Sequence, residues 1–375
     1  MGTKICHITI SDASHERRLN NQFDLARETG RSSLCFALFR ENLPEKENIN
    51  GTGIHRIKIR HPEGGVLKFI EFNVKLFIRL LKSDFDILHV HDLWVLPAAG
   101  LFSIFRNKYI IYDAHEFYMG LEIFKNRKIK KIVWYLAERI FITRVKALIT
   151  VSEPLRRLYL RAYPCVKNIS SIVLRNVPSL RDTNPERKVK TTGIINKQYL
   201  IFQGIFKPGR GLTQLIRAME KIDDIPLIMV GYGELEEQLK KEVKDRKLEN
   251  KVVFTGKVNQ EEYLNYTQNA YLGLVLFEPD SINYRYALPN KFFEYIHAGI
   301  PVICSDIITF RHILKDFEVG VLVNPWDVGQ IVETVRSLLQ NSIRYEQLKR
   351  NCLQARNMIN WENEKIKLDL LYQKK

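Results

Sequence analysis

The feature that most constrains the fold of this chain is a repeated alternation between two hydrophobic periods. Short runs of apolar and β-branched residues alternate with longer segments in which apolar residues recur about every 3.6 residues. Such alternation is typical of βαβ units, in which helices connect and cover the strands of a parallel sheet. It occurs twice, so we predict an α/β protein of two doubly wound, Rossmann-like domains facing a central cleft.

The same runs set the predicted domain boundaries. In the first domain, residues 1–180, strands are predicted at 4–10, 33–39, 55–59, 87–91, 109–113, 147–151 and 171–174. In the second domain, residues 198–358, they are predicted at 199–202, 226–230, 252–255, 272–277, 301–304 and 320–323. Residues 181–197 are polar and follow neither period, which is typical of a linker. Residues 359–375 are predicted to form a helix that packs back on the first domain.

Positive charge is concentrated in the first half of the chain. Residues 1–200 hold 34 Lys and Arg against 19 Asp and Glu, whereas the remaining residues hold 24 against 23. The first domain is therefore expected to face an anionic surface, either lipid or nucleic acid. No basic-aromatic array of the kind that binds single-stranded nucleic acid is visible, which favours lipid.

Cysteine usage and hydropathy bear on the expected location. The five cysteines lie far apart and form no Cys-x-x-Cys pair, which argues against a disulfide framework and against a zinc site. The N-terminus has no long apolar segment, and no stretch of about 18 apolar residues occurs in the chain. We therefore expect a cytoplasmic protein.

The segment from Ala287 to Ile303 carries the clearest chemistry. Pro289 suits the first turn of a helix, Gly299 suits its end, and a buried strand follows. A helix N-terminus presents free N–H groups and a partial positive charge, so it is a natural phosphate site, here reinforced by Lys291. Glu294, one turn further along, could accept hydrogen bonds from ribose hydroxyls. Taken alone, the segment also fits a capped core helix with Glu294 in a structural pair.

This segment resembles the Pro-Asn-Lys-x-Phe-Glu-Tyr motif of family-four retaining glycosyltransferases of the GT-B fold, especially those that build bacterial surface polysaccharides. Further motifs of that family are matched by the segments 112–116, 202–212, 230–233 and 253–258, so the resemblance covers most of the chain. It implies a nucleoside-diphosphate sugar as the donor, bound by the second domain, with no metal or other cofactor.

The resemblance also implies the donor-site residues. They are Gly204, Lys207, Gly209, Arg210, Gly211, Gly231, Lys257, Leu288, Pro289, Asn290, Lys291 and Glu294. Two positions depart from the family pattern: Ile205 replaces an arginine, for which Lys207 is a possible substitute, and Tyr286 replaces the first of two motif glutamates. Lys207, Arg210 and Glu294 are expected to act in catalysis.

On the acceptor side, the resemblance places a sugar-contacting histidine at His115, which we expect to be the fourth catalytic residue. Ser14, His91 and Glu116 are weaker acceptor-side candidates, and Ser14 is alternatively the N-cap of the first helix. His89, His91 and Asp92 imitate metal ligands, but we identify no third convergent ligand and assign no metal.

Two basic, amphipathic segments, 66–82 and 125–135, match an interfacial membrane contact, although each alone also fits a core helix with solvated lysines. We therefore expect a peripheral protein on the inner face of the cytoplasmic membrane, with a lipid-linked or oligosaccharide acceptor. The predicted activity is transfer of a sugar, with retention, to a growing lipopolysaccharide, O-antigen, capsule or exopolysaccharide. Two alternatives remain open, a sugar-nucleotide epimerase of the same fold and a catalytically silent membrane scaffold.

Overall fold

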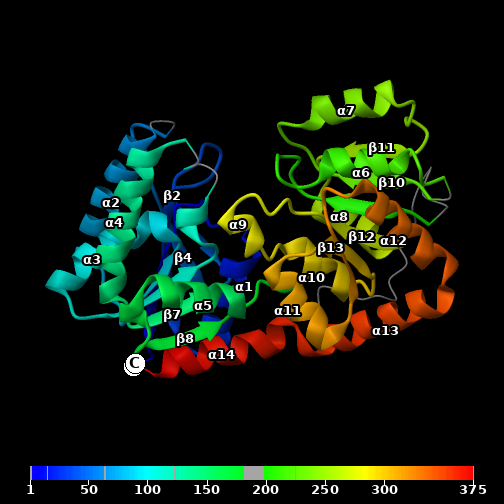
Figure 1. Cartoon of the computed structure of the whole chain (residues 1–375). Helices are drawn as coiled ribbons and strands as arrows, with labels where there is room; N and C mark the ends of the chain where they lie inside the picture. Colours follow the sequence, from blue (N-terminus) through cyan, green and yellow to red (C-terminus); the bar gives the residue numbers. More distant parts are fainter. Residues whose placement is uncertain are drawn as a thin grey trace. The chain divides into compact units, whose positions relative to one another are not determined.

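The computed structural model describes residues 2–14, 16–62, 65–121, 124, 126–180, 198–223 and 225–374. They form two compact units (Figure 1). The first unit comprises Met1–Asn176 and Asn363–Lys375, and the second comprises Val177–Glu362. The predicted linker, 181–197, lies outside the described residues. Each unit is built around a largely parallel sheet with helices, which confirms the predicted fold class.

The first unit contains an eight-stranded sheet of order β3-β4-β2-β1-β5-β6-β7-β8. Its strands are β1 (Lys4–Ile8), β2 (Ser32–Leu38), β3 (Lys46–Ile49), β4 (Thr52–Ile57), β5 (Ile87–His91), β6 (Tyr109–Ala114), β7 (Ala147–Thr150) and β8 (Ser170–Val173). All neighbouring strands are parallel except β3 and β4, which are antiparallel.

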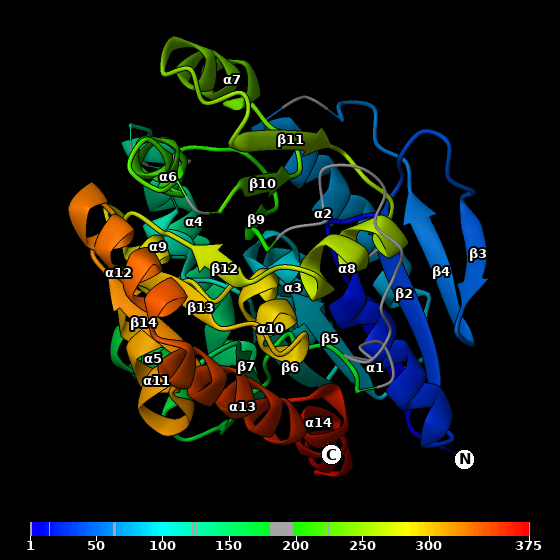
Figure 2. The same cartoon turned by 90° about the vertical axis from the view of Figure 1, so that its right-hand side faces the viewer.

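Strand β3 is the element that the hydrophobic pattern did not predict. It reads Lys-Glu-Asn-Ile and lies at the edge of the sheet (Figure 2), so it has no apolar run. The turn to β4 is formed by Asn50 and Gly51, whose φ angles are 53° and 84°. Positive φ at both residues is what a two-residue hairpin turn requires, so the Asn-Gly pair was the local signal for this strand.

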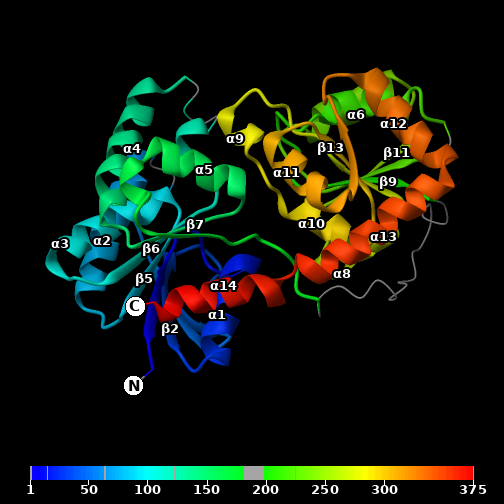
Figure 3. The same cartoon turned by 60° about the horizontal axis from the view of Figure 1, so that its bottom comes forward.

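Helices cover both faces of the first sheet. They are α1 (Arg17–Glu28), α2 (Val66–Leu81), α3 (Leu96–Phe105), α4 (Lys128–Phe141), α5 (Glu153–Ala162) and the C-terminal part of α14 (Trp361–Gln373). Figure 3 shows α1 and α14 on one face and α2, α3 and α4 on the other. Lys365 of α14 forms an ion pair of 2.7 Å with Glu28 of α1, and Tyr372 reaches the sheet at His89 with a hydrogen bond of 2.8 Å.

The second unit contains a six-stranded parallel sheet of order β11-β10-β9-β12-β13-β14. Its strands are β9 (Leu200–Gln203), β10 (Leu227–Val230), β11 (Val252–Gly256), β12 (Leu272–Val275), β13 (Val302–Ser305) and β14 (Gly320–Val323). Its helices are α6 (Leu212–Met219), α7 (Glu236–Asp245), α8 (Gln260–Gln268), α9 (Ile282–Arg285), α10 (Asn290–His297), α11 (Ile308–Phe317), α12 (Val328–Gln340) and α13 (Ser342–Met358). All six strands occur where the pattern predicts them.

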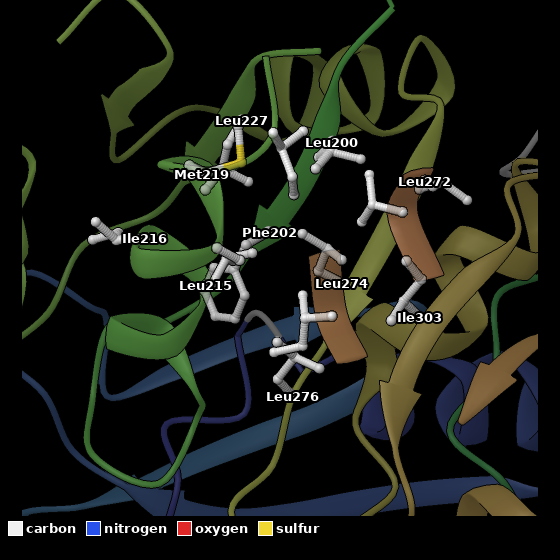
Figure 4. Packing of buried hydrophobic residues seen from close by; sticks show 14 of the residues in the cluster. Leu200, Phe202, Leu215, Ile216, Met219, Leu227, Leu272, Leu274, Leu276 and Ile303 are labelled. Carbon is white, nitrogen blue, oxygen red and sulfur yellow. The ribbon is translucent and has the colours of Figure 1, made fainter. Parts of the chain in front are cut away.

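Alternating side chains of the central strand β9 build the core of this unit on both faces of the sheet. Leu200 and Phe202 belong to a cluster with α6 and α12, part of which Figure 4 shows. Ile201, on the opposite face, belongs to a second cluster with α10 and α11. The strand is therefore apolar throughout, as expected for a parallel strand buried on both sides.

Replacing Leu274 by alanine tests this core. Leu274 is fully buried in the cluster of Figure 4, so its loss should lower the free energy of unfolding by about 2–5 kcal/mol in chemical denaturation. The control Ile343→Ala removes a side chain that is 82% exposed and should change it by less than about 0.5 kcal/mol. Equal effects of the two substitutions would contradict the packing described.

Candidate functional site

Two glycine loops meet at the carboxyl edge of the second sheet. Gly204 follows β9 with φ 127°, and Gly231 follows β10 with φ 141°, values that only glycine adopts readily. A Cβ atom on Gly231 would lie 2.0 Å from the carbonyl oxygen of Gly204. The backbone contact leaves no room for a side chain at position 231, and the positive φ of Gly204 disfavours one at position 204.

Two cations converge on this point. A Cβ atom on Gly204 would lie 3.5 Å from Nη1 of Arg210 and 3.6 Å from Nζ of Lys291. Lys291 is only 6% exposed, and neither cation forms an ion pair with a residue in the described part of the chain. Nε of Arg210 is buried and has no hydrogen-bond partner among those residues. Two adjacent, poorly solvated cations that form no ion pair with a described residue provide a ready site for an anion.

The environment of these cations disfavours their charge. Burial and the neighbouring Arg210 hold the pKa of Lys291 well below its usual value, and Glu294 opposes the shift only in part. Burial also lowers the pKa of Arg210. The ammonium of Lys291 lies 3.6 Å from the centroid of the Phe202 ring, a favourable but weaker contact than a carboxylate would provide. A bound diphosphate would therefore supply the missing counter-charge.

The structure places Lys291, rather than Lys207, beside Arg210. Lys207 does not lie within 4 Å of the point on Gly204 where the two cations meet. It is half-buried and forms no hydrogen bond or ion pair with any described residue. Ile205, at the position of the family's arginine, is exposed. Lys291 is thus the residue whose position can compensate for that missing arginine.

The loop that carries Arg210 is held by helix α9. The hydroxyl of Tyr284 in α9 donates a hydrogen bond of 2.9 Å to the carbonyl of Pro208. The Tyr284 ring covers Gly209 so closely that a Cβ there would lie 2.1 Å from it, and Gly211 is the N-cap residue of α6. The loop is therefore shaped by packing and is not an unsupported glycine-rich turn.

Helix α10 follows the sequence expectation closely. Pro289 is its N-cap residue, the exposed Asn290 opens it, and Gly299 follows its end with φ 74°. Glu294 is almost buried, and its Oε2 accepts hydrogen bonds of 2.9 Å from Gln203 and 2.8 Å from Tyr263. Sequence reasoning missed both of these partners because they come from β9 and α8, far away in the chain. They fix the orientation of the Glu294 carboxylate.

The remaining donor-side candidates lie at the margin of this arrangement. Leu288 is half-buried next to Pro289, and Lys257 is exposed with its Nζ 5.9 Å from the centroid of the Tyr232 ring. Tyr286, in place of the motif glutamate, lines a cavity of about 620 Å³ together with Trp326 and Arg311. A phenol at this position offers a single hydroxyl where a carboxylate would offer two acceptor oxygens.

In the first unit, His115 lies directly after β6 and is about one-quarter exposed. Its Nδ1 is 3.1 Å from Oδ1 of Asp92, and its Nε2 is 3.6 Å from Oδ2 of Asp113. Glu116 follows it, and the Glu116 carbonyl accepts a hydrogen bond from Tyr159. His115 therefore lies between two carboxylates, that of Asp92 directly after β5 and that of Asp113 in β6.

The negative charge of Asp113 is balanced by an arginine of helix α1. It is fully buried and accepts hydrogen bonds of 2.8 Å and 2.6 Å from the guanidinium of Arg18 in α1, with Gln22 at 3.3 Å. Burial alone would raise the pKa of Asp113, but Arg18 and His115 hold it well below its usual value. Sequence reasoning missed Arg18, since a buried arginine on a helix resembles any surface cation until its partner is known.

The other two acceptor-side candidates have structural contacts. His91 is fully buried, and its Nε2 lies 3.1 Å from Nδ1 of His7. The prediction that Ser14 caps the first helix is wrong, because Glu16 is the N-cap residue of α1. Ser14 instead accepts a hydrogen bond of 2.8 Å from Arg56, which ties the loop to β4.

The sequence analysis found no third ligand near His89 and His91, but the structure supplies one. His7 on β1 lies opposite His89 on β5, and the three rings approach closely enough to be considered for a metal. The rings of His89 and His91 are stacked at 13°, with centroids 4.4 Å apart, so their in-plane lone pairs do not converge. In a second candidate set, His91, Asp113 and His115, the oxygens of Asp113 already accept from Arg18. Neither arrangement favours chelation.

A broad apolar and basic surface covers helices α2, α3 and α4, which lie side by side (Figures 1 and 3). We call it the α2–α4 face. Of the 23 large apolar side chains exposed among the described residues, 14 lie on these helices, so exposed apolar side chains are concentrated on this surface. They are Val66, Leu67, Ile70, Val74, Ile78, Leu81, Leu101, Ile104, Phe105, Ile129, Ile132, Val133, Leu136 and Ile140.

Cations accompany the apolar side chains on the α2–α4 face. The exposed ones are Arg79, Lys128, Lys131 and Arg139, and the only acidic residues of these helices are Glu71, paired with Lys75, and the buried Glu138. Within the described parts of the chain, no helix is long and apolar enough to cross a membrane. The α2–α4 face is therefore amphipathic in the manner of an interfacial surface.

Comparison with known families assigns both halves of the chain. Residues 25–173 match the model described as Glycosyltransferase Family 4, and residues 184–354 match the model described as Glycosyl transferases group 1. The chain belongs to the family-four-type glycosyltransferases of the GT-B fold. The resemblance stated from the motifs is thereby confirmed.

Several proteins are similar to this glycosyltransferase over most of their length. A phosphatidyl-myo-inositol mannosyltransferase of Mycobacterium leprae is 23% identical over 76% of this chain and 73% of its own. The O-antigen chain mannosyltransferase C of Escherichia coli is 24% identical over 66% of this chain and 70% of its own. Sucrose-phosphate synthase of Thermosynechococcus elongatus superposes with a TM-score of 0.82 at 16% identity, covering 99% and 98%. Anabaena HepE, solved in complex with UDP, gives 0.76 at 13% identity over the whole of both chains.

The paired cations of this glycosyltransferase can be tested with inorganic pyrophosphate. Arg210→Ala and Lys291→Ala should each weaken its binding roughly 10- to 100-fold in calorimetric titration, because each removes a charge-assisted donor. Lys207→Ala, the matched control, should cost about fivefold at most. The affinity of the natural protein should fall as pH rises, since Lys291 with its lowered pKa then loses its proton. Unchanged affinity in both variants would contradict the site.

Proposed function

We propose that this glycosyltransferase transfers a sugar from a nucleoside-diphosphate sugar, with retention, to a lipid-linked glycan during cell-surface polysaccharide synthesis. The observation that carries the proposal is the convergence of Arg210 and Lys291 at Gly204, where neither forms an ion pair with a described residue and Nε of Arg210 has no hydrogen-bond partner among those residues. A diphosphate would match the charge of this site. The UDP complex of the similar HepE fold is in keeping with such a donor.

On the donor side, the residues are assigned by position. The diphosphate would lie against the Gly204 loop and the N-terminus of α10, where Lys291 and Arg210 meet. The carboxylate of Glu294, held by Gln203 and Tyr263, would accept hydrogen bonds from the ribose hydroxyls. Departure of the diphosphate develops negative charge, so cations already in place stabilise the transition state more than the ground state.

We propose retention from the family resemblance, in a form that needs no covalent intermediate between sugar and protein. We assign no carboxylate as nucleophile, because the one placed at the donor site, Glu294, is already engaged by Gln203 and Tyr263. In the proposed reaction the acceptor oxygen bonds to the anomeric carbon on the face from which the phosphate leaves. The bond from that carbon to the phosphate oxygen breaks, and that oxygen takes the proton of the acceptor hydroxyl. No metal or further cofactor is required in this scheme.

The acceptor class is proposed from two sources. Relatives along most of the chain include a phosphatidyl-myo-inositol mannosyltransferase and an O-antigen chain mannosyltransferase. The α2–α4 face adds a physical reason, because apolar side chains among cations suit the boundary of an anionic bilayer. We therefore propose a peripheral protein at the inner face of the cytoplasmic membrane.

Donor turnover tests the assignment of Glu294. Glu294→Gln keeps the size of the side chain but removes its charge, so sugar transfer from the best nucleotide sugar should fall about 100-fold. Glu318→Gln changes an exposed carboxylate paired with Arg344 and is the matched control. Transfer in Glu294→Gln at the level of the control would refute the ribose assignment. Nucleotide release that needs no acceptor would instead favour the epimerase alternative.

Membrane binding tests the α2–α4 face. The double substitution Phe105→Asp with Ile129→Asp should reduce co-sedimentation with phosphatidylglycerol vesicles at least about tenfold, since each side chain loses roughly 1.5–3 kcal/mol of burial in the bilayer. Ile343→Asp alters an equally exposed residue of the second unit and should leave binding unchanged. Undiminished binding of the double variant would exclude this face as the contact.

A further inference from the structure

Asp92 has a backbone conformation that residues other than glycine rarely adopt. It follows β5 directly, with φ 72° and ψ 160°, a region that is almost restricted to glycine. Its N–H still donates a hydrogen bond of 3.2 Å to the carbonyl of Asp113 on the neighbouring strand. A strained residue of this kind persists only where surrounding contacts determine it, and such residues cluster at functional sites.

Two side-chain contacts hold one carboxylate oxygen of Asp92. Oδ1 accepts a hydrogen bond from the hydroxyl of the buried Tyr118 and lies 3.1 Å from Nδ1 of His115. Tyr118 comes from the turn after β6, so the carboxylate is fixed from the same segment that carries His115. A glycine at position 92 would relieve the backbone strain but could not contact the imidazole.

His115 has a carboxylate at each ring nitrogen. Asp92 faces Nδ1 and Asp113 faces Nε2, and Nε2 lies 3.6 Å from Asp113 without a hydrogen-bond partner among the described residues. The other charged and titratable groups acting on this ring are Arg18 of α1, His89 and His91 of β5, and Glu16 before α1. Burial and Arg18 oppose the charge on His115, but the two carboxylates outweigh them and raise its pKa.

We infer that Asp92 is a positioning residue that keeps His115 oriented and doubly protonated, so that His115 donates a hydrogen bond during transfer and does not accept the acceptor's proton. This inference rests on the proposed function, because it concerns the role of His115 at the acceptor side of that reaction. It also fits the proposed scheme, in which the departing phosphate oxygen receives the proton. An imidazolium with a carboxylate at each nitrogen has no lone pair to act as a base.

The first test measures the protonation of His115 without any transfer assay. In NMR titration of the full chain, with the His115 signal assigned by its loss in His115→Gln, the natural protein should titrate above the ordinary pKa of about 6.5. Asp92→Asn should lower that midpoint by roughly one pH unit or more. Asp84→Asn, which removes an exposed carboxylate paired with Lys4, should leave it unchanged. A midpoint unaffected by Asp92→Asn would overturn the inference.

The second test separates a donor from a base. Transfer should be retained at low pH and lost as pH rises through the His115 midpoint, and in Asp92→Asn this loss should move to lower pH. A rate that instead rises with pH through that midpoint would show a general base and overturn the inference. If Asp92→Asn does not fold, Asp92→Gly suits the positive φ, removes the same carboxylate and should lower both midpoints. Absence of transfer together with the expected titration would count against the proposed function and not against the charge of His115.

Discussion

The site in the second unit depends on two adjacent, poorly solvated cations that form no ion pair with a described residue. Charges removed from water are normally paired, and an unpaired one destabilises the folded chain. Arg210 and Lys291 are brought together by different segments, a glycine loop after β9 and the first turn of α10. Both segments lie at the carboxyl edge of a parallel sheet, where a helix N-terminus adds further positive potential. A bound diphosphate would pair with both cations and so offset the free energy by which these charges destabilise the folded chain.

In the first unit, by contrast, the buried carboxylate is paired with a cation. Asp113 is paired with Arg18, and the histidines behind it have lowered pKa values through burial, so this layer is close to neutral. The exception is His115, whose raised pKa comes from Asp92 and Asp113 despite burial. Its ion pairs stabilise the fold fully below the unfolded pKa of about 6.5, and this contribution is lost as pH rises through the higher folded value.

Periodicity predicted the fold well because parallel strands buried on both faces are apolar throughout. It missed only β3 among the strands, whose sequence is polar and whose signal was the Asn50-Gly51 turn. The site was predictable where it depends on local sequence, as for Pro289, Glu294 and Gly299 in α10. It was not predictable where distant segments meet: the pairing of Lys291 with Arg210, the contact of Arg18 with Asp113, and the conformation of Asp92 follow from tertiary packing, which no local pattern encodes.

Thermal unfolding of the full chain with UDP-, GDP-, ADP- and CMP-sugars tests the central claim most directly, since a ligand that binds only the folded state raises the apparent Tm. The account predicts a rise with one class of nucleoside-diphosphate sugar, lost in both Arg210→Ala and Lys291→Ala and kept in Lys207→Ala. No rise with any nucleotide sugar, or an undiminished rise in the first two variants, would contradict it.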